Sequence, residues 1–161
     1  MTNLAETHDY NLEAHLEYAE RAVAAHNSRL TPIRRHIYKC LLKTDTPLGA
    51  YDILDMLDGI GASKPPTVYR ALDWLIEMGL ARKVESISKY MAKTASEEEA
   101  HMALLLCQTC GHAEPFDAGP ALKSLGNLAK AKGFQEQQTV IEILVNVPSI
   151  RADFKLHITY I

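Results

Sequence analysis

Apolar residues recur at helical spacing through the first half of the chain, and this pattern predicts four successive helices. We expect them at about residues 10–27, from 31 onward, across the AYDILDML segment and at about 65–78. Polar and charged residues occupy the remaining side of each helix. The residues expected on the buried sides are Leu12, Leu16, Ala19, Val23, Ile33, Ile37, Cys40, Leu41, Ile53, Leu54, Leu57, Val68, Leu72, Leu75 and Ile76.

Proline and glycine mark the ends of two of these helices. Thr31 is a good N-cap, and Pro32 fits the first helical position, where no backbone N–H is needed. Ser63 can cap the fourth helix, whose first turn contains the proline pair 65–66. Gly79 is expected to end that helix.

Two strand-like runs, LARKVES and ISKYMAK, follow the fourth helix and are separated by a polar turn. Three helices followed by a two-stranded ribbon are typical of the winged helix, whose third helix enters the DNA major groove with its N-terminal residues leading. Tyr69 and Arg70 lie near that end, and arginine suits bidentate contact with guanine. Two plainer interpretations stay open: Tyr69 as a half-buried helix residue, and Arg70 as the ion-pair partner of Asp73.

Charge is distributed unevenly along the chain. The net charge of −3 argues against a general polyanion binder. Basic and acidic residues number 12 each up to residue 93, whereas residues 94–161 contain 5 basic and 8 acidic ones. Arg29, Arg34, Arg35, Lys39 and Lys43 follow one another with no acidic residue between them. This patch supplies candidate phosphate contacts, although such a cluster alone is also typical of a solvated helix face.

The second half follows a polar, acidic hinge, KTASEEEA, and mixes strands with one helix. HMALLLC and FQEQQTVIEILVNV predict strands, and DAGPALKSLGNLAKAKG predicts a helix with Leu122, Leu125 and Leu128 facing inward. Strict alternation in DFKLHITYI predicts one more half-buried strand, at residues 154–160. The CxxC in CQTCG is a knuckle whose two thiolates could turn toward one tetrahedral ion.

Length and composition narrow the class of protein. The 161 residues suffice for one ordinary domain or two small ones. No stretch approaches the roughly 20 apolar residues of a membrane span, and the polar N-terminus does not resemble a secretory signal, so we expect a cytoplasmic protein. Three cysteines do not suggest a disulfide scaffold, and the βαβ context of a redox CxxC is absent. No nucleophile–base pair, phosphate loop or paired-carboxylate site is apparent, so we expect no enzyme.

RLTPIRRHIY, GAYDILDML and KPPTVYRALDWL with GLARKVES resemble the DNA-binding half of the ferric uptake regulator (Fur) superfamily. The AYDIL and PPTVYRALD segments are similar to its zinc uptake regulator (Zur) branch, and the resemblance covers roughly residues 10–135. It implies a homodimeric, metal-responsive repressor with an N-terminal winged helix and a C-terminal α/β dimerisation domain. It also implies that Tyr51 and Arg70 read purines, a role for Tyr51 that the hydrophobic pattern does not indicate.

The resemblance further implies two zinc sites that this sequence contains only in part. The second CxxC expected after the last strand is missing from VIEILVNVPSIRADF. Two of the sensing ligands are replaced by Arg82 and Lys93, and positive charge opposes zinc binding. The other two ligands match with a small offset. The candidate zinc ligands are Cys107, Cys110, His101 and Glu114.

Two outcomes stay open at the CxxC knuckle. Cys107 and Cys110 could hold zinc together with His101, His112 or residues of a symmetry mate. Alternatively, apolar packing of the strand at 154–160 could substitute for the metal.

We therefore expect an α+β protein with a winged-helix DNA-binding domain at residues 1–92, a hinge at 93–99 and a small α/β dimerisation domain at 100–161. The expected function is sequence-specific repression of zinc homeostasis genes, with double-stranded DNA and a second copy of the chain as partners. The alternative is a relative that has lost metal sensing and acts as a metal-independent regulator or a protein-interaction module. The DNA-binding candidates are Tyr51, Thr67, Tyr69, Arg70, Arg34, Arg35, Lys39 and Lys64.

Overall fold

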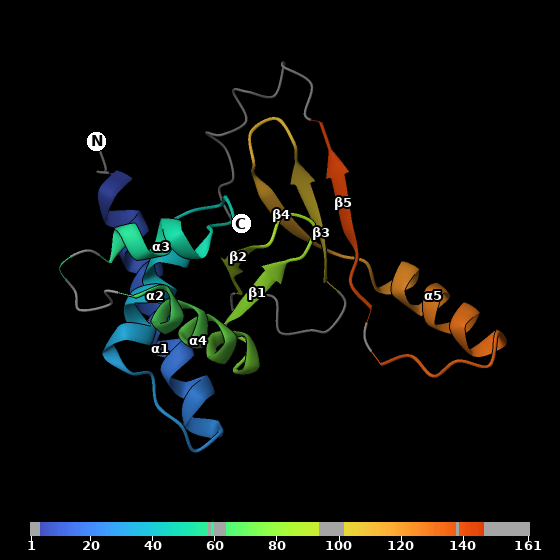
Figure 1. Cartoon of the computed structure of the whole chain (residues 1–161), viewed down its shortest axis with the longest axis horizontal. Coiled ribbons are helices and arrows are strands. Elements are labelled where there is room, and N and C mark those ends of the chain that lie inside the picture. The colour runs from blue at the N-terminus through green and yellow to red at the C-terminus, as the bar shows by residue number, and fades with distance from the viewer. Residues whose placement is uncertain (1–3, 58, 60–63, 94–101, 138, 147–161) are drawn as a thin grey trace. The chain divides into compact units, whose positions relative to one another are not determined.

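A computed structural model describes residues 4–57, 59, 64–93, 102–137 and 139–146. Within them the chain forms five helices and five strands, the α+β class that the sequence predicts. The chain divides into two compact units, residues 1–99 and 100–161, and each unit has its own sheet (Figure 1). Most of the predicted hinge, His101 and the predicted strand at 154–160 lie outside the described residues. No helix in these ranges is both long enough and apolar enough to cross a membrane.

Four helices and one hairpin build the first unit (Figure 1). The two strands of the hairpin are antiparallel, with Ala81 opposite Ala92 and Val84 opposite Lys89. The last three helices and the hairpin have the order predicted for a winged helix, which confirms that prediction. The bounds are α1 Leu4–Ala25, α2 Pro32–Leu42, α3 Ala50–Met56, α4 Pro65–Glu77, β1 Ala81–Val84 and β2 Lys89–Ala92.

The predicted buried sides of the four helices meet in a single core. Tyr38 also belongs to this core, although the apolar pattern does not predict it. Its hydroxyl donates to the Lys93 carbonyl at 3.1 Å, which satisfies the polar tip of a fully buried ring and ties α2 to the end of β2. The predicted positions that are fully buried are Leu16, Ala19, Val23, Ile37, Leu41, Ile53, Leu57, Val68, Leu72 and Leu75.

The starts of α2 and α4 follow the proline signals in the sequence. Thr31 precedes α2 with an extended backbone, and Pro32 is in its first turn. Prolines likewise open α4, but its N-cap residue is Lys64 rather than the predicted Ser63. Lys64 makes no side-chain capping hydrogen bond. The prolines can therefore begin this helix without a capping side chain, since their missing N–H groups need no partner there.

Gly79 ends α4 as predicted, with a left-handed backbone at φ 71°. Its N–H donates to the Ile76 carbonyl at 3.0 Å, and the N–H of Leu80 donates to the Leu75 carbonyl at 2.8 Å. This pair of bonds is a Schellman motif, which satisfies the last carbonyls of the helix. The chain then turns directly into β1.

The second unit is a three-stranded sheet with one helix. Strand β3 (Met102–Cys107) lies in the middle, antiparallel to β4 (Ala113–Asp117) and parallel to β5 (Glu142–Val145). The sequence pattern does not predict β4, because Pro115 interrupts it. Since β4 is an edge strand, the missing proline N–H costs the sheet little.

The helix α5 (Gly119–Ala131) forms where it is predicted, but its leucines do not face inward as predicted. Leu122 is half-buried, while Leu125 is 45% and Leu128 60% exposed. The prediction that these leucines face inward is therefore wrong within a single chain. Helical periodicity identifies the apolar side of a helix, but it does not identify what covers that side. Further exposed apolar side chains of this unit are Phe134, Val140, Ile143 and Leu144.

Candidate nucleic-acid interface

The first turns of α4 present three predicted DNA-binding side chains to solvent. The proline pair 65–66 fixes the start of the helix, and the Thr67 N–H donates to the Lys64 carbonyl at 3.0 Å. With the apolar side of α4 in the core, Thr67, Tyr69 and Arg70 are exposed, Tyr69 by 41%. Within the described residues, Arg70 has no carboxylate partner, so the alternative ion pair with Asp73 does not form. The guanidinium is therefore available to an external acceptor.

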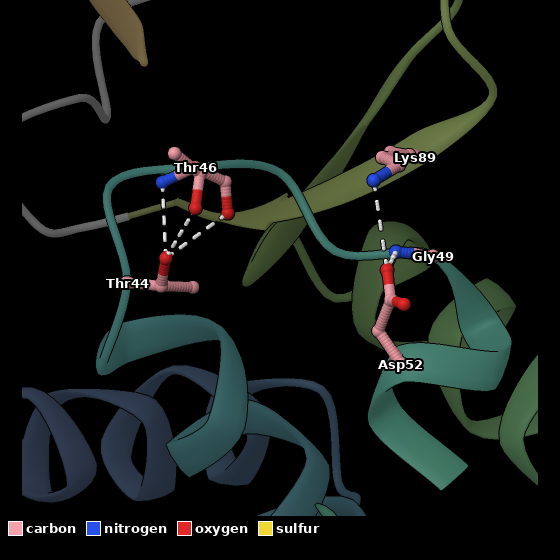
Figure 2. Close-up of polar contacts among 5 residues, drawn as sticks. All are labelled: Thr44, Thr46, Gly49, Asp52 and Lys89. Carbon is pink, nitrogen blue, oxygen red and sulfur yellow. Dashed lines mark hydrogen bonds and ion pairs between the residues drawn. The ribbon is translucent and has the colours of Figure 1, made fainter. Parts of the chain in front are cut away.

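Tyr51 lies in the first turn of α3 and is 64% exposed. The neighbouring Asp52 holds this turn in place, because its Oδ2 accepts the Gly49 N–H at 2.7 Å and lies 3.6 Å from the Lys89 Nζ (Figure 2). The backbones of Leu48 and Tyr90 also exchange two hydrogen bonds of 2.8 Å. The start of α3 is thus fastened to the wing strand β2.

The turn that leads into α3 is closed by two threonines. The Thr44 hydroxyl lies 2.7 Å from the Thr46 hydroxyl and accepts the Thr46 N–H at 3.1 Å (Figure 2). The sequence does not predict these contacts, because Lys89, the ion-pair partner of Asp52, lies far along the chain. The spacing of Gly49 and Asp52 is the one signal that could have suggested an acidic cap three residues into the helix.

The basic residues of α2 have different surroundings. Arg34 shares a hollow of about 250 Å³ with residues of α4, among them Thr67 and Arg70. Arg35 pairs instead with two glutamates of α1, and Lys39 is half-buried. The structure therefore brings Arg34, Thr67 and Arg70 together, but it does not bring Arg35 or Lys39 to the same hollow.

The CxxC knuckle in the second unit forms a tight turn. The Gly111 N–H donates to the Cys107 carbonyl at 2.9 Å, and the Cys107 N–H donates to the His112 carbonyl at 2.9 Å. Cys107 is buried and Cys110 is exposed, and neither forms a disulfide bond. The left-handed backbone of Gly111, at φ 74°, permits the turn.

The described residues do not complete a zinc site around this knuckle. His112 Nε2 lies 4.0 Å from the Glu114 Oε2, so the predicted ligand Glu114 has an imidazole beside it. No group of three or more His, Cys, Asp or Glu side chains converges as metal ligands in the part of the chain that the structure describes. The two thiolates are suitable donors, but a structural zinc ion ordinarily takes four ligands.

The two replaced sensing positions, Arg82 and Lys93, belong to the wing hairpin. Arg82 is half-buried on β1 opposite Met91, and the Lys93 N–H donates to the Leu80 carbonyl at 2.8 Å. Both backbones are thus fixed near the same end of the ladder. Two cationic side chains there do not fit a zinc site, because their charge adds to the cost of binding a cation.

Among the described residues of the first unit, three ionisable groups have shifted pKa values with structural causes. Burial raises the pKa of the Cys40 thiol, and burial also raises the pKa of the Tyr90 phenol. A hydrogen bond to Glu85, 2.6 Å away, raises the pKa of Lys83 on the wing. Cys40 is accordingly a protonated core residue rather than a metal ligand.

Comparisons with known proteins agree with the motifs. Residues 25–144 match the ferric uptake regulator family. The chain is 37% identical over 129 residues to the zinc uptake regulation protein of Escherichia coli (strain K12), and the match covers 79% of this chain and 75% of that protein.

Solved structures give the same result. The fold matches a zinc uptake regulator complexed with zinc and DNA at a TM-score of 0.81 and 32% identity, covering 89% of this chain and 97% of that one. It matches the crystal structure of holo XcZur at a TM-score of 0.76 and 32% identity, covering 86% and 98%. With a family match over most of its length and relatives of this identity and coverage, the chain belongs to the ferric uptake regulator family.

Proposed function

We propose that this protein is a sequence-specific, DNA-binding transcription repressor that controls zinc homeostasis genes. The members of its family are transcription regulators, so the protein is not an enzyme. The observation that carries the proposal is the exposed start of α4, where a proline-fixed first turn presents Thr67, Tyr69 and Arg70, and where no carboxylate of the described residues pairs with Arg70. A helix with this exposure in a winged helix is suited to the major groove.

The residues divide into base-reading and backbone-binding groups. Arg70 and Tyr51 are the proposed base-reading residues, with Tyr69 and Thr67 beside them on α4. Arginine in the major groove discriminates guanine by bidentate hydrogen bonds. The proposed phosphate contacts are Arg34, Lys39 and Lys64, which would fix register without reading sequence. Arg35, the other predicted contact, is left out of this group because it pairs with two glutamates of α1.

The second partner is another copy of the chain. Exposed leucines on α5 and exposed Ile143 and Leu144 on β5 provide the apolar surface for association through residues 100–161. Two-fold symmetry would let a palindromic operator supply two short half-sites. In this proposal residues 1–92 are the DNA-binding domain, 93–99 the hinge, and the protein works in the cytoplasm where its operator lies.

The proposed cofactor is zinc, for which the Cys107 and Cys110 thiolates are the chain's suitable donors. When bound, zinc would lock the knuckle by cross-linking its two ends, and any further ligands must come from beyond the described residues or from the partner. Of the predicted ligands, His101 lies beyond the described residues, whereas Glu114 lies within them, on β4.

A second candidate function is regulation that does not depend on zinc sensing. It is favoured by Arg82 and Lys93, whose charges occupy two positions that the resemblance assigns to zinc ligands. In this case the winged helix binds DNA equally well with and without metal. The two candidates share the DNA-binding surface and differ only in its control.

The first test replaces Arg70 by Ala in the full-length protein. Binding to an operator selected from a random DNA pool should weaken by about 1–3 kcal/mol, with relaxed preference at one base pair. Arg21→Ala, which removes an exposed arginine from α1, is the matched control and should bind normally. Unchanged affinity and specificity of Arg70→Ala would show that α4 is not the recognition helix.

The second test separates the two candidates by measuring zinc content and operator affinity before and after a strong chelator. A sensor loses affinity on chelation, whereas a metal-independent regulator retains it. Cys107→Ser combined with Cys110→Ser should abolish any zinc bound at the knuckle. Full zinc content in this double variant would contradict the assignment of the thiolates.

A further inference from the structure

Arg34 and Arg35 are neighbours in sequence but face different helices. Arg35 forms an ion pair with Glu20 of α1 and lies 3.8 Å from the Glu13 carboxylate. An arginine shared by two carboxylates must give up these partners before it can bind a phosphate. Arg35 therefore connects α2 to α1, and two carboxylates already compete with any phosphate for its guanidinium.

Arg34 lies against α4. Its guanidinium carbon is 3.9 Å from the centroid of the Trp74 ring, well within the distance of a cation–π contact. Trp74 is half-buried one helical turn after Arg70. Stacking occupies the flat face of a guanidinium and leaves the N–H groups at its edge available, which is the geometry that phosphate oxygens require.

The N–H groups of Arg34 have a place in which to meet such an acceptor. The hollow of about 250 Å³ between the start of α2 and the first turns of α4 is lined by Thr31, Ile33, Arg34, Thr67, Arg70 and Ala71. The described residues that line it supply two guanidinium groups and two hydroxyl groups but no carboxylate. Among the described residues, neither Arg34 nor Arg70 has an acidic partner. The hollow thus offers donors and positive charge to an anionic group.

We propose that this hollow binds a phosphate of the DNA backbone through Arg34, and that Trp74 is the positioning residue that holds Arg34 ready. The proposal rests on the proposed function of DNA binding through α4. A long, rotamer-rich side chain loses freedom when it binds, and a ring that already restrains it reduces that loss. A phosphate fixed beside Arg70 would set the register in which Arg70 meets a base edge.

The experiment measures affinity for a short duplex of random sequence over a series of salt concentrations, using the full-length protein and fluorescence anisotropy. Arg34→Ala should weaken binding about fivefold to tenfold near physiological salt and reduce the slope of log K against log salt by about one. Arg35→Ala is the matched control, because it removes the same charge from the adjacent position. It should leave the slope nearly unchanged while lowering the melting temperature.

Trp74 is tested through its coupling to Arg34. Trp74→Leu should weaken binding severalfold with the salt slope retained, and Trp74→Phe, which keeps an aromatic ring, should restore most of the affinity. In an Arg34→Ala background, Trp74→Leu should have no further effect on binding. A merely structural role of Trp74 would instead lower affinity by the same factor in both backgrounds.

The outcomes distinguish this inference from the proposed function. If the unaltered protein binds DNA but Arg34→Ala keeps its affinity and slope, only the inference is overturned. Equal slope losses for Arg34→Ala and Arg35→Ala would also overturn it, since the two arginines would then act alike. If the unaltered protein binds no DNA, with or without added zinc, the proposed function and the inference both fail.

Discussion

Leu72 of α4 and Leu128 of α5 both occupy the apolar side of an amphipathic helix, yet Leu72 is fully buried and Leu128 is 60% exposed. In the first unit, the apolar sides of the four helices pack together with the hairpin in one core. In the second unit, the only buried residue of α5 is Gly126. The comparison indicates that the first unit buries its core within one chain, whereas α5 has an apolar surface that a second copy can cover.

The largest expected effect is destabilisation of the first unit by Leu72→Ala. Removing a fully buried leucine side chain should lower the free energy of unfolding by about 2–5 kcal/mol, because transfer and cavity costs add. Trp74 is the only tryptophan of the chain and lies on the same helix, so its fluorescence during urea unfolding reports on this unit.

Leu128→Ala is the control for this measurement. Its effect on the Trp74 transition should stay within about 0.5 kcal/mol, as for an exposed position. A comparable loss in both variants would mean that the two units do not differ in the way that their burial suggests.

The next effect concerns association of the second unit. Leu125→Ala combined with Leu128→Ala should weaken the homodimer by about 1–3 kcal/mol, because apolar area that a second copy would cover is removed. Light scattering over a dilution series should show dissociation at concentrations roughly 10-fold to 100-fold higher than for the unaltered protein.

Lys123→Ala, an exposed position on the same helix, is the matched control and should leave the dimer intact. If the double leucine variant dimerises normally, another surface forms the interface. A monomeric unaltered protein at micromolar concentration would contradict dimerisation itself.

The same contrast explains how much of the fold the sequence predicts. All four helices of the first unit and both wing strands could be predicted, since periodicity, proline and glycine act locally. Tyr38 was missed because its burial depends on a distant carbonyl, that of Lys93. Strand β4 was missed because an edge strand tolerates the Pro115 that argues against a central one.

In the candidate site too, features set by local sequence could be predicted, whereas features set by distant contacts could not. The exposure of Arg70 and Tyr69 could be predicted from the position of α4's apolar side. The exposure of Tyr51 was suggested by resemblance alone. What separates Arg34 from Arg35 could not be predicted, because their partners, Trp74 on α4 and the α1 glutamates, are set by helix packing.

The smallest effect tests the junction between α3 and the wing, a contact internal to the first unit. Asp52→Ala removes the acceptor of the Gly49 N–H and should cost about 1 kcal/mol of unfolding free energy, as for other N-terminal caps. Lys89→Met removes only the ion pair, whose members are 44% and 52% exposed, and should cost a few tenths of a kcal/mol at most.

The two variants should also differ in DNA binding. Asp52→Ala loosens the turn that carries Tyr51, so it should reduce discrimination between operator and random DNA while leaving the salt dependence unchanged, since no phosphate contact is lost. Lys89→Met should retain the discrimination, because the Gly49 hydrogen bond and the Leu48–Tyr90 backbone pairing remain. Equal losses in the two variants would show that the ion pair, rather than the cap, positions Tyr51 against the wing.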